Sequence, residues 1–264
     1  MNLHQQPDAT DDRLLPQAKI RMADFLDGDG AETDAVLADL DGCLISGDVV
    51  LPGAGELARR AGRRLWIVSN NSADTAETLS QRLSRLGLDI GSDRILLAGE
   101  EAVRDLAAAQ PGARVALFAA PQLTALATAL GLDVCRGQAD ARLTLLARDP
   151  ALTLLEIERL MRLLHRGAVL HLANPDMTHP AADGVPVPET GAILAAMRAG
   201  LPGLQFVCQG KPSPAMIFRA LDRAKVAPER AVFLGDTDET DGRAARAAGV
   251  PFVLLQRPGE GGAS

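Results

Sequence analysis

The sequence predicts an α/β protein built on a doubly wound parallel sheet, and two observations lead to this prediction. Apolar runs recur along the chain, and most are continuous rather than alternating, which is typical of strands buried on both faces of a parallel sheet. Helical patterns lie between these runs, and such alternation is typical of the α/β class. The 264 residues, 47% of them hydrophobic, suffice for one large domain or two modest ones.

The apolar runs place the expected strands along the chain. They span residues 35–40, 64–70, 114–119, 142–147, 168–173, 204–208, 231–235 and 251–255. The clearest helical patterns span residues 13–26, 75–87, 152–167 and 214–226. In the last of these, Ser213 precedes Pro214, which predicts an N-cap followed by proline at the first helical position.

Charge and cysteine content restrict the class of protein. The net charge of −7 argues against a nucleic-acid-binding surface, which is normally basic. Phosphate substrates remain open, because a site can be locally positive within an acidic protein. The three cysteines show no CxxC spacing and predict neither a disulfide framework nor a zinc site.

No stretch approaches the roughly 18 apolar residues of a membrane span, and the N-terminus lacks a signal-peptide pattern. We therefore expect a cytoplasmic protein without membrane or nucleic-acid partners.

Two aspartates follow the first expected strand. Asp39 and Asp41 are separated by one leucine and followed by Gly42. Open parallel sheets bind ligands at the carboxyl ends of their strands, and two carboxylates this close repel each other and attract a cation. The stretch therefore indicates a Mg²⁺ site with one carboxylate as a nucleophile. A turn in which both carboxylates cap local backbone groups explains it equally well.

The second expected strand ends in a group of short polar residues. Ser69, Asn70 and Asn71 offer side chains and backbone N–H groups that can hold an oxyanion. A simple helix entry, with Asn71 or Ser72 as the N-cap, is the preferred interpretation of this stretch taken alone.

Two further stretches carry charge next to expected strands. Lys211 lies in a loop stiffened by two prolines and can balance anionic oxygens, although most single lysines in turns are simply solvated. Asp236 directly follows an expected strand, and Asp238, Glu239 and Asp241 come soon after it. These acids repel one another, so they form either a solvated loop or a cation site.

Together and in this order, the four stretches resemble the four-motif signature of the haloacid dehalogenase superfamily. The second aspartate is typical of its phosphatases. Ser-Asn-Asn and Gly-Lys-Pro further resemble the subgroup that contains 4-nitrophenyl phosphatase, pyridoxal phosphate phosphatase and phosphoglycolate or glycerol phosphate phosphatases. The resemblance covers about residues 34–255 and is weakest between the second and third motifs, where this subgroup carries an inserted cap. It implies a Rossmann-like core of residues 13–106 plus 205–264 and an α/β cap of residues 107–204.

The resemblance also implies catalytic roles. Asp39 would be the nucleophile that accepts the phosphoryl group. Asp41 would protonate the leaving alcohol and later activate water. Ser69 and Lys211 would hold phosphate oxygens, and Lys211 would also orient Asp39.

The resemblance implies Mg²⁺ as the cofactor and a small phosphorylated metabolite as the partner. Asp39, the backbone carbonyl of Asp41 and Asp236 would bind the metal, and Asp241 would bind its water shell or steady Lys211. The expected substrate-binding residues are Gly42, Asn70, Asn71, Asp176 and His179.

The implied function is Mg²⁺-dependent hydrolysis of a small phosphomonoester through an aspartyl phosphate. Asp176 and His179 lie in the segment 174–184, which resembles the part of the subgroup's cap that faces the active site; an exposed proline-rich loop is the alternative. The chain contains no tyrosine, which weakens the case for pyridoxal phosphate. A nucleotide or sugar phosphate remains an alternative substrate, and a catalytically silent binding module an alternative function. Relatives that dimerise through the cap make a homodimer an expectation here.

Overall fold

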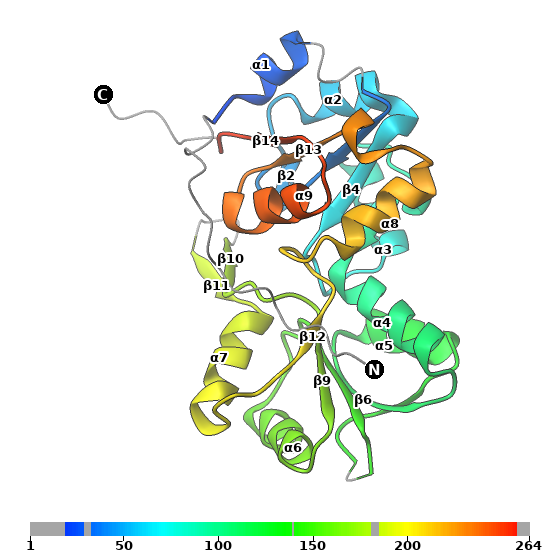
Figure 1. Cartoon of the computed structure of the whole chain (residues 1–264), viewed down its shortest axis with the longest axis vertical. Helices are drawn as coiled ribbons and strands as arrows, with labels where there is room; N and C mark the ends of the chain where they lie inside the picture. The colour runs from blue at the N-terminus through cyan, green and yellow to red at the C-terminus, as the bar shows by residue number, and fades with distance from the viewer. Residues whose placement is uncertain (1–18, 29–32, 139, 181–184, 258–264) are drawn as a thin grey trace.

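The computed structural model describes residues 19–28, 33–138, 140–180 and 185–257, and it confirms the α/β class. Two parallel five-stranded sheets form two lobes stacked along the long axis of the molecule (Figure 1). The first lobe is built from the two ends of the described chain, and the second from its middle. Among the described residues, no helix combines the length and the apolar character that crossing a membrane requires.

The sheet of the first lobe has the strand order β14-β13-β1-β4-β5, and all its pairs are parallel. Its strands are β1 Ala35–Ala38, β4 Leu65–Ser69, β5 Ile95–Leu97, β13 Ala231–Gly235 and β14 Phe252–Leu254. From β1 the chain adds β4 and β5 on one side of β1, and it later adds β13 and β14 on the other side. The strand order therefore reverses between β1 and β13, and the carboxyl ends of these two strands are the place where such a sheet binds ligands.

Helices cover both faces of this sheet. They are α1 Met22–Asp27, α2 Ala54–Ala61, α3 Ala76–Arg85, α8 Ala215–Ala224 and α9 Arg243–Ala247. Successive side chains of a strand point to opposite faces. Val36 accordingly packs in a cluster with residues of α2 and α3, whereas Leu37 packs with residues of α8 and α9. This two-sided burial explains why the strands are continuous apolar runs, and it confirms the predicted double winding.

The second lobe repeats the plan with the strand order β12-β9-β8-β6-β7, again all parallel. Its strands are β6 Arg114–Phe118, β7 Asp133–Cys135, β8 Leu143–Leu146, β9 Val169–Leu172 and β12 Val207–Cys208. Its helices are α4 Ala98–Ala109, α5 Pro121–Ala129, α6 Leu154–His165 and α7 Thr190–Gly200. Residues of α4 and α5 pack on one face of the sheet, and residues of α6 and α7 on the other.

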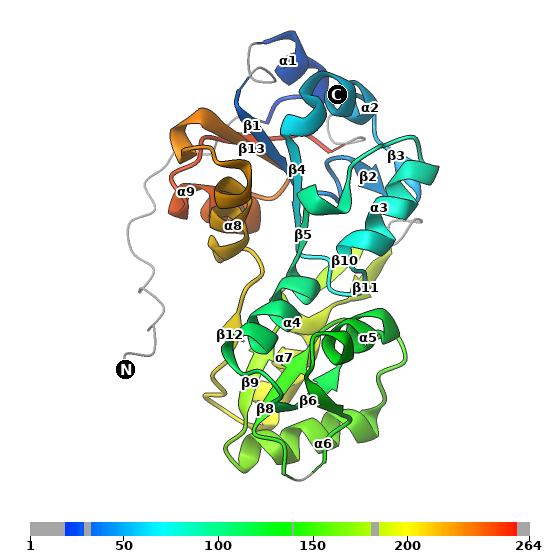
Figure 2. The ribbon, with the colours of Figure 1, turned by 90° about the vertical axis from the view of Figure 1, so that its right-hand side faces the viewer.

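Two antiparallel hairpins and a π-helical turn complete the parts of the fold that surround the site. The first hairpin pairs β2 Ile45–Ser46 with β3 Val49–Val50, and the second pairs β10 Thr178–Pro180 with β11 Pro186–Pro188. The second hairpin lies between the lobes in both views (Figures 1 and 2). The π-helical turn, Asp238–Gly242, connects β13 to α9. Short 3-10 turns span Gly62–Arg64, Ser92–Arg94 and Pro228–Arg230.

The predicted strands are all present, but the periodicity missed the shortest elements. β5 was missed because three apolar residues lead directly into α4, and β7 and the hairpin strands are equally short. The helix predicted from Pro214 begins one residue later, at Ala215, whose N–H donates to the Ser213 hydroxyl at 3.3 Å. Of the helix predicted over residues 13–26, the structure has α1 from Met22 to Asp27; residues 19–21 are not helical, and residues 13–18 lie outside the described part of the chain.

The division between the lobes differs from the predicted one at both junctions. β12, expected in the first lobe, pairs with β9 in the second. Ala102 and Val103 of α4 pack in the core of the second lobe. We therefore propose that the lobes divide after β5 and after β12, rather than at residues 106 and 204.

Candidate active site

The carboxyl ends of three neighbouring strands bring polar side chains to one edge of the first sheet. Asp39 follows β1, Ser69 ends β4, and Asp236 follows β13. Lys211 arrives from the segment that returns from β12 to α8. All four line a cavity of about 730 Å³ between the lobes. The sequence-predicted motifs are thus brought together in space.

Lys211 is a buried cation held between two carboxylates. Its Nζ lies 2.6 Å from Asp39 Oδ1 and 2.7 Å from Asp241 Oδ1, and its side chain is 2% exposed. Burial by itself would lower the pKa of Lys211, but Asp241 and Asp39 outweigh it and raise the pKa above its ordinary value. The Nζ also lies 5.6 Å from the centre of the Phe233 ring, a distance at which the ring attracts a cation. Lys211 therefore stays charged and fixes the orientation of the Asp39 carboxylate.

The donors beside Asp39 fit a Mg²⁺ ion. A carboxylate oxygen of Asp39, a carboxylate oxygen of Asp236 and the Cys43 Sγ lie within 4.8 Å of one another. The two carboxylates are buried, so they repel each other and favour a divalent cation between them. Burial raises the pKa of the Cys43 thiol well above its ordinary value, and a neutral thiol is a poor ligand for Mg²⁺. Asp39 and Asp236 would therefore hold the ion. The Arg257 side chain contacts Asp236 and would have to move away from it for the ion to bind.

Asp241 is buried beside Lys211 and the turn that follows β13. Its Oδ2 accepts a hydrogen bond from the Thr237 N–H at 3.2 Å, and its Oδ1 contacts Lys211. Burial raises the pKa of Asp241, whereas Lys211 opposes that rise. Of the two roles that the resemblance allows, the structure places Asp241 against Lys211.

Gly42 has a steric role that differs from the predicted role in substrate binding. Its N–H donates to the Ile45 carbonyl at 2.8 Å, so this donor is already used within the turn. A Cβ added at Gly42 would lie 2.0 Å from Asp236 Oδ2, and the φ of +86° is one that other residues rarely adopt. Glycine is needed here so that the turn after β1 and the carboxylate after β13 can approach each other.

Ser69 and Asn71 shape the turn that follows β4. The Ser69 hydroxyl accepts from the Asn71 N–H at 3.1 Å and still lines the cavity. Asn71 Oδ1 accepts from the N–H groups of Ala73 and Asp74, at 3.0 and 2.9 Å. The helix that follows is capped by Thr75 and not by Asn71 or Ser72, so that alternative was wrong. Asn71 forms the turn that presents Ser69 to the cavity.

Asn70 connects the two lobes through its side-chain amide. Its Nδ2 donates to both carboxylate oxygens of Asp176, at 3.1 and 3.0 Å, and to the Lys211 carbonyl at 3.0 Å. Its Oδ1 accepts from the Lys211 N–H at 2.7 Å. Every polar atom of the Asn70 side chain is thus used within the protein. These bonds hold the second lobe over Lys211. Both Asn70 and Asp176 also line the cavity, and substrate binding by them stays a prediction.

A second link between the lobes lies next to the first. Asn174 Nδ2 donates to the Asn70 carbonyl at 2.8 Å and to the Ser72 hydroxyl at 3.1 Å. The same hydroxyl accepts from the Arg148 N–H at 3.1 Å. The turn after β4 therefore bonds to the ends of both β8 and β9, and these bonds close the cavity on that side.

Asp41 and His179 face the cavity from opposite lobes. Asp41 is an exposed residue that lines the open cavity. The protein atoms around its carboxyl displace water and raise its pKa, whereas Arg82 and His179 oppose the rise. Burial lowers the pKa of His179, and Asp41 opposes that change. A carboxyl with a raised pKa suits the acid–base role predicted for Asp41.

Two charged residues of the second lobe complete the cavity wall, and sequence reasoning missed both. Arg148 follows β8, and Glu189 directly precedes α7. The sequence does mark Arg148 as a candidate site residue, because it follows an apolar strand in the same way as Asp39 does. The side chains that line the cavity in the described part of the chain include no Phe or Trp.

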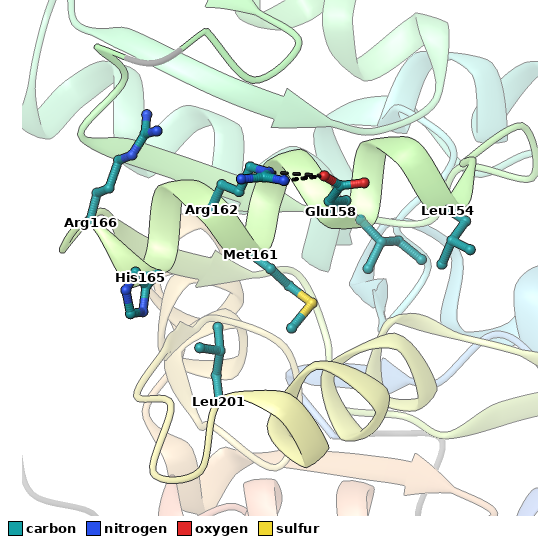
Figure 3. A pocket seen from close by; sticks show the side chains of 8 residues that line it. Leu154, Glu158, Met161, Arg162, His165, Arg166 and Leu201 are labelled. Carbon is teal, nitrogen blue, oxygen red and sulfur yellow. Dashed lines mark hydrogen bonds and ion pairs between the residues drawn. The ribbon is translucent and has the colours of Figure 1, made fainter.

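A second hollow lies far from these groups. It has a volume of about 540 Å³ and lies between α6 and the end of α7 (Figure 3). Its main polar groups, Glu158 and Arg162, are already paired with each other at 2.6 Å. Leu154, Met161 and Leu201 supply apolar surface there.

Comparisons with known proteins agree with this geometry. The haloacid dehalogenase-like hydrolase model matches residues 36–133, and a related HAD-hydrolase-like model matches residues 208–260. The chain is 31% identical to mouse chronophin over 249 residues, which cover 84% of this chain and 80% of chronophin. It is 29% identical to dihydroxyacetone phosphatase of Corynebacterium glutamicum over 224 residues, which cover 83% and 80% of the two chains. The structure of glycerol phosphate phosphatase from Mycobacterium tuberculosis, in complex with magnesium, superposes with a TM-score of 0.77 at 28% identity, covering 85% of this chain and 68% of that one.

Proposed function

Because the chain belongs to the haloacid dehalogenase-like hydrolases, we propose that its cavity hydrolyses a small phosphate ester through a phosphorylated Asp39. The protein is a Mg²⁺-dependent phosphomonoesterase. The observation that supports the assignment of Asp39 is its contact with Lys211, 2.6 Å away, on the same edge of the sheet as Asp236. A silent binding module would not need to keep this buried pair of unlike charges, whose desolvation is costly.

The residues divide the chemistry between them. Asp39 would attack phosphorus while Lys211 and Ser69 hold phosphate oxygens, so that the transferring group is positioned and its charge balanced. Asp41 would give its proton to the leaving oxygen, and as a carboxylate it would then activate the water that releases phosphate from Asp39. Asp39, the Asp41 carbonyl and Asp236 would hold Mg²⁺, which would neutralise negative charge on the phosphoryl group.

Removal of the metal should abolish activity reversibly. Asp39 and Asp236 would then repel each other and the phosphate, so exhaustive chelation with EDTA should reduce turnover to background. Added Mg²⁺ should restore it, whereas Ca²⁺ should restore little, because its looser and larger coordination shell disturbs the in-line geometry. Turnover of 4-nitrophenyl phosphate measures the effect. Full activity after chelation would contradict metal dependence.

For the substrate, we propose a short, hydroxylated phosphate ester such as glycerol 3-phosphate or dihydroxyacetone phosphate. The second lobe contributes Arg148, His179 and Glu189 to the cavity lining, and these polar groups favour hydrogen bonding; the described lining offers no Phe or Trp for stacking a ring. Two relatives, dihydroxyacetone phosphatase and D-glycerol 3-phosphate phosphatase, are named for such esters and support the same substrate class. Comparing kcat/KM for these esters with pyridoxal phosphate, a nucleotide and a sugar phosphate tests the proposal. A preference for any of the last three would overturn it.

Asp176 and His179 should respond differently to alanine substitution. His179 faces the cavity, so His179→Ala should raise KM for the preferred ester by roughly ten- to a hundredfold and spare 4-nitrophenyl phosphate, which needs little help from the second lobe. Asp176 is bonded to Asn70, so Asp176→Ala should loosen the contact between the lobes and reduce turnover of both substrates alike. Measuring kcat/KM of both variants on both substrates distinguishes the roles. Wild-type values for His179→Ala would remove it from the site.

Two further expectations remain proposals. We propose a homodimer through the second lobe, supported by the exposed side chains of Leu154 and Leu155 on α6 and Val207 on β12, which such an interface would cover. Sedimentation across a range of concentrations tests it, and a monomer throughout would contradict it.

We also propose a cytoplasmic location, supported by three free thiols, Cys43, Cys135 and Cys208. Fractionation of cells tests it, and recovery outside the cytoplasmic fraction would contradict it.

A further inference from the structure

The chain crosses between the two lobes twice, and each crossing leads into a helix. The first crossing runs from β5 into α4, and the second runs from β12 through Lys211 into α8. Residues of α4 pack in the core of the second lobe, whereas residues of α8 pack in the core of the first. Both helices lie on the side of the molecule away from the β10–β11 hairpin (Figures 1 and 2). The contact between them is therefore a second junction between the lobes, besides the one at the cavity.

Four charged side chains form the contact between α4 and α8. The Glu101 side chain of α4 is 2% exposed and accepts hydrogen bonds from Arg219 Nη1 and, at 3.1 Å, from Arg223 Nη2. Arg219 Nη2 also donates to Asp105 Oδ1 at 2.7 Å. Two acids of one helix thus face two arginines of the other. We call these four residues the junction cluster.

The residue before Glu101 fixes the same end of α4 to another helix of the first lobe. Glu100 Oε2 accepts a hydrogen bond from the Ala76 N–H at 2.5 Å, and Ala76 is the first residue of α3. A carboxylate is favoured at a helix N-terminus, where the backbone N–H groups lack partners within the helix. Adjacent carboxylates in the first turn of α4 therefore bind both α3 and α8.

The start of α4 also contacts the turn that presents Ser69 to the cavity. The Gly99 N–H donates to the Asn71 carbonyl at 3.2 Å. A Cβ added at Gly99 would lie 2.8 Å from Ser72 Cα, so the two backbones are in close contact. The placement of α4 relative to the first lobe is therefore linked directly to the edge of the cavity.

We propose that the junction cluster positions the second lobe over the catalytic edge, with Glu101 and Arg219 as its main positioning residues. None of the four is among the described residues that line the cavity, so the cluster would act only through the placement of the lobe. On the cavity side, bonds of Asn70 and Asn174 join the lobes. A lobe held on both sides cannot tilt, whereas a lobe held on the cavity side alone can.

A tilt of the second lobe should weaken recognition of the leaving group and spare phosphoryl transfer; this step rests on the proposed function. Arg148 and His179 belong to the second lobe and would move with it. Lys211 would stay, although it lies on the second crossing, because the first lobe holds it. Its N–H and carbonyl are bonded to the Asn70 side chain, and its Nζ contacts Asp39.

Arg219→Met tests the placement of the lobe with two substrates. The substitution removes the contacts to Glu101 and Asp105 and leaves Arg223 as a partner of Glu101, so the protein should fold. We expect KM for glycerol 3-phosphate to rise roughly tenfold, with kcat for 4-nitrophenyl phosphate unchanged, because only the second lobe is displaced. No rise in KM, or an equal loss of kcat/KM on both substrates, would overturn the inference.

Glu101→Ala breaks the same junction from the other helix. KM for glycerol 3-phosphate should rise here too. The double variant with Arg219→Met should be no worse than the worse single variant, because both substitutions remove one link. Effects that multiply in the double variant would show two independent roles and would contradict a shared link.

Two other arginines separate the placement of the lobe from charge and from stability. Arg162→Met on α6 removes an arginine whose partner Glu158 lies 2.6 Å away in the same helix, so it should match wild type. Arg94→Met removes a buried arginine that donates to the carbonyls of Gly62 and Leu65 within the first lobe. It should lower the melting temperature and leave KM unchanged. The same rise in KM in Arg94→Met would attribute the effect to lost stability and refute the role of the cluster.

Hydrogen exchange followed by NMR tests the junction without relying on turnover. In Arg219→Met the Gly99 amide, which donates to the Asn71 carbonyl at the first crossing, should exchange faster than in wild type. The amides of β6 and β9, inside the second lobe, should exchange as in wild type. A wild-type protein without phosphatase activity would refute the proposed function and leave this test in force. Unchanged exchange at Gly99 would refute the inference itself.

Discussion

Asp39→Asn should reduce turnover by a factor on the order of a thousand or more, because the amide cannot act as the nucleophile. The fold should persist. Lys211 keeps Asp241 as a partner 2.7 Å away, and the repulsion between residue 39 and Asp236 in the metal-free protein is removed. In EDTA the melting temperature should therefore be no lower than that of wild type. Turnover of 4-nitrophenyl phosphate and thermal unfolding measure the two effects.

A matched control for Asp39→Asn lies on the surface. Asp222 on α8 has an 81% exposed side chain that pairs with the 79% exposed Lys225, so Asp222→Asn should leave turnover and stability unchanged. Near-wild-type turnover in purified Asp39→Asn would rule out the route through a phosphorylated Asp39.

Lys211→Met should damage both activity and stability. The phosphate would lose a fixed positive charge, and Asp39 and Asp241 would be left buried without their shared cation. Breaking a buried ion pair by removing one partner costs about 3–5 kcal/mol of unfolding free energy. The destabilisation should grow as the pH rises, because carboxyls with raised pKa values in the folded protein are tolerated while protonated and destabilise once they ionise. Urea unfolding at acidic and at alkaline pH measures this trend.

Lys225→Met is the control for the loss of a lysine. Lys225 follows α8 and has a 79% exposed side chain, so its removal should change neither property measurably. If Lys211→Met unfolded at the same urea concentration as wild type, the buried cation would not have the structural role assigned to it.

The catalytic edge of the first sheet was predictable because its chemistry follows directly from strand ends. Asp39, Ser69 and Asp236 each end or follow an apolar run, and a parallel sheet brings such ends together wherever the runs occur in the sequence. Lys211 is less regular, and the resemblance to the family, rather than periodicity, marked it as part of the site.

The roles of Gly42 and Asn70 were not predictable, because they depend on contacts between distant segments. Gly42 is needed in part because Asp236, nearly two hundred residues later, lies where its Cβ would be. Asn70 is used by Asp176 and Lys211, and neither contact has a signal in the sequence around Asn70. The same reason hid Glu189, which lines the cavity from the residue before α7 and has no motif around it in the sequence.

The elements that periodicity missed are short for a physical reason. β5 and β7 have three residues each, and each is an edge strand of its sheet. An edge strand pairs with one neighbouring strand, so a long apolar run is unnecessary there. The division that we propose between the lobes differs from the expected one for a related reason: β12 has two residues, and only its pairing with β9 shows which sheet it joins.

The phosphorylated Asp39 is the central claim, and chemical trapping tests it most directly. Borohydride reduces an aspartyl phosphate to homoserine and leaves a free carboxylate unchanged. Wild-type protein should be mixed with excess substrate and Mg²⁺, quenched in acid during turnover, reduced and analysed by peptide mass spectrometry. We expect homoserine at position 39 alone, and none when substrate is omitted. Homoserine at another aspartate, or an unmodified Asp39 in protein that was turning over at the quench, would contradict the account.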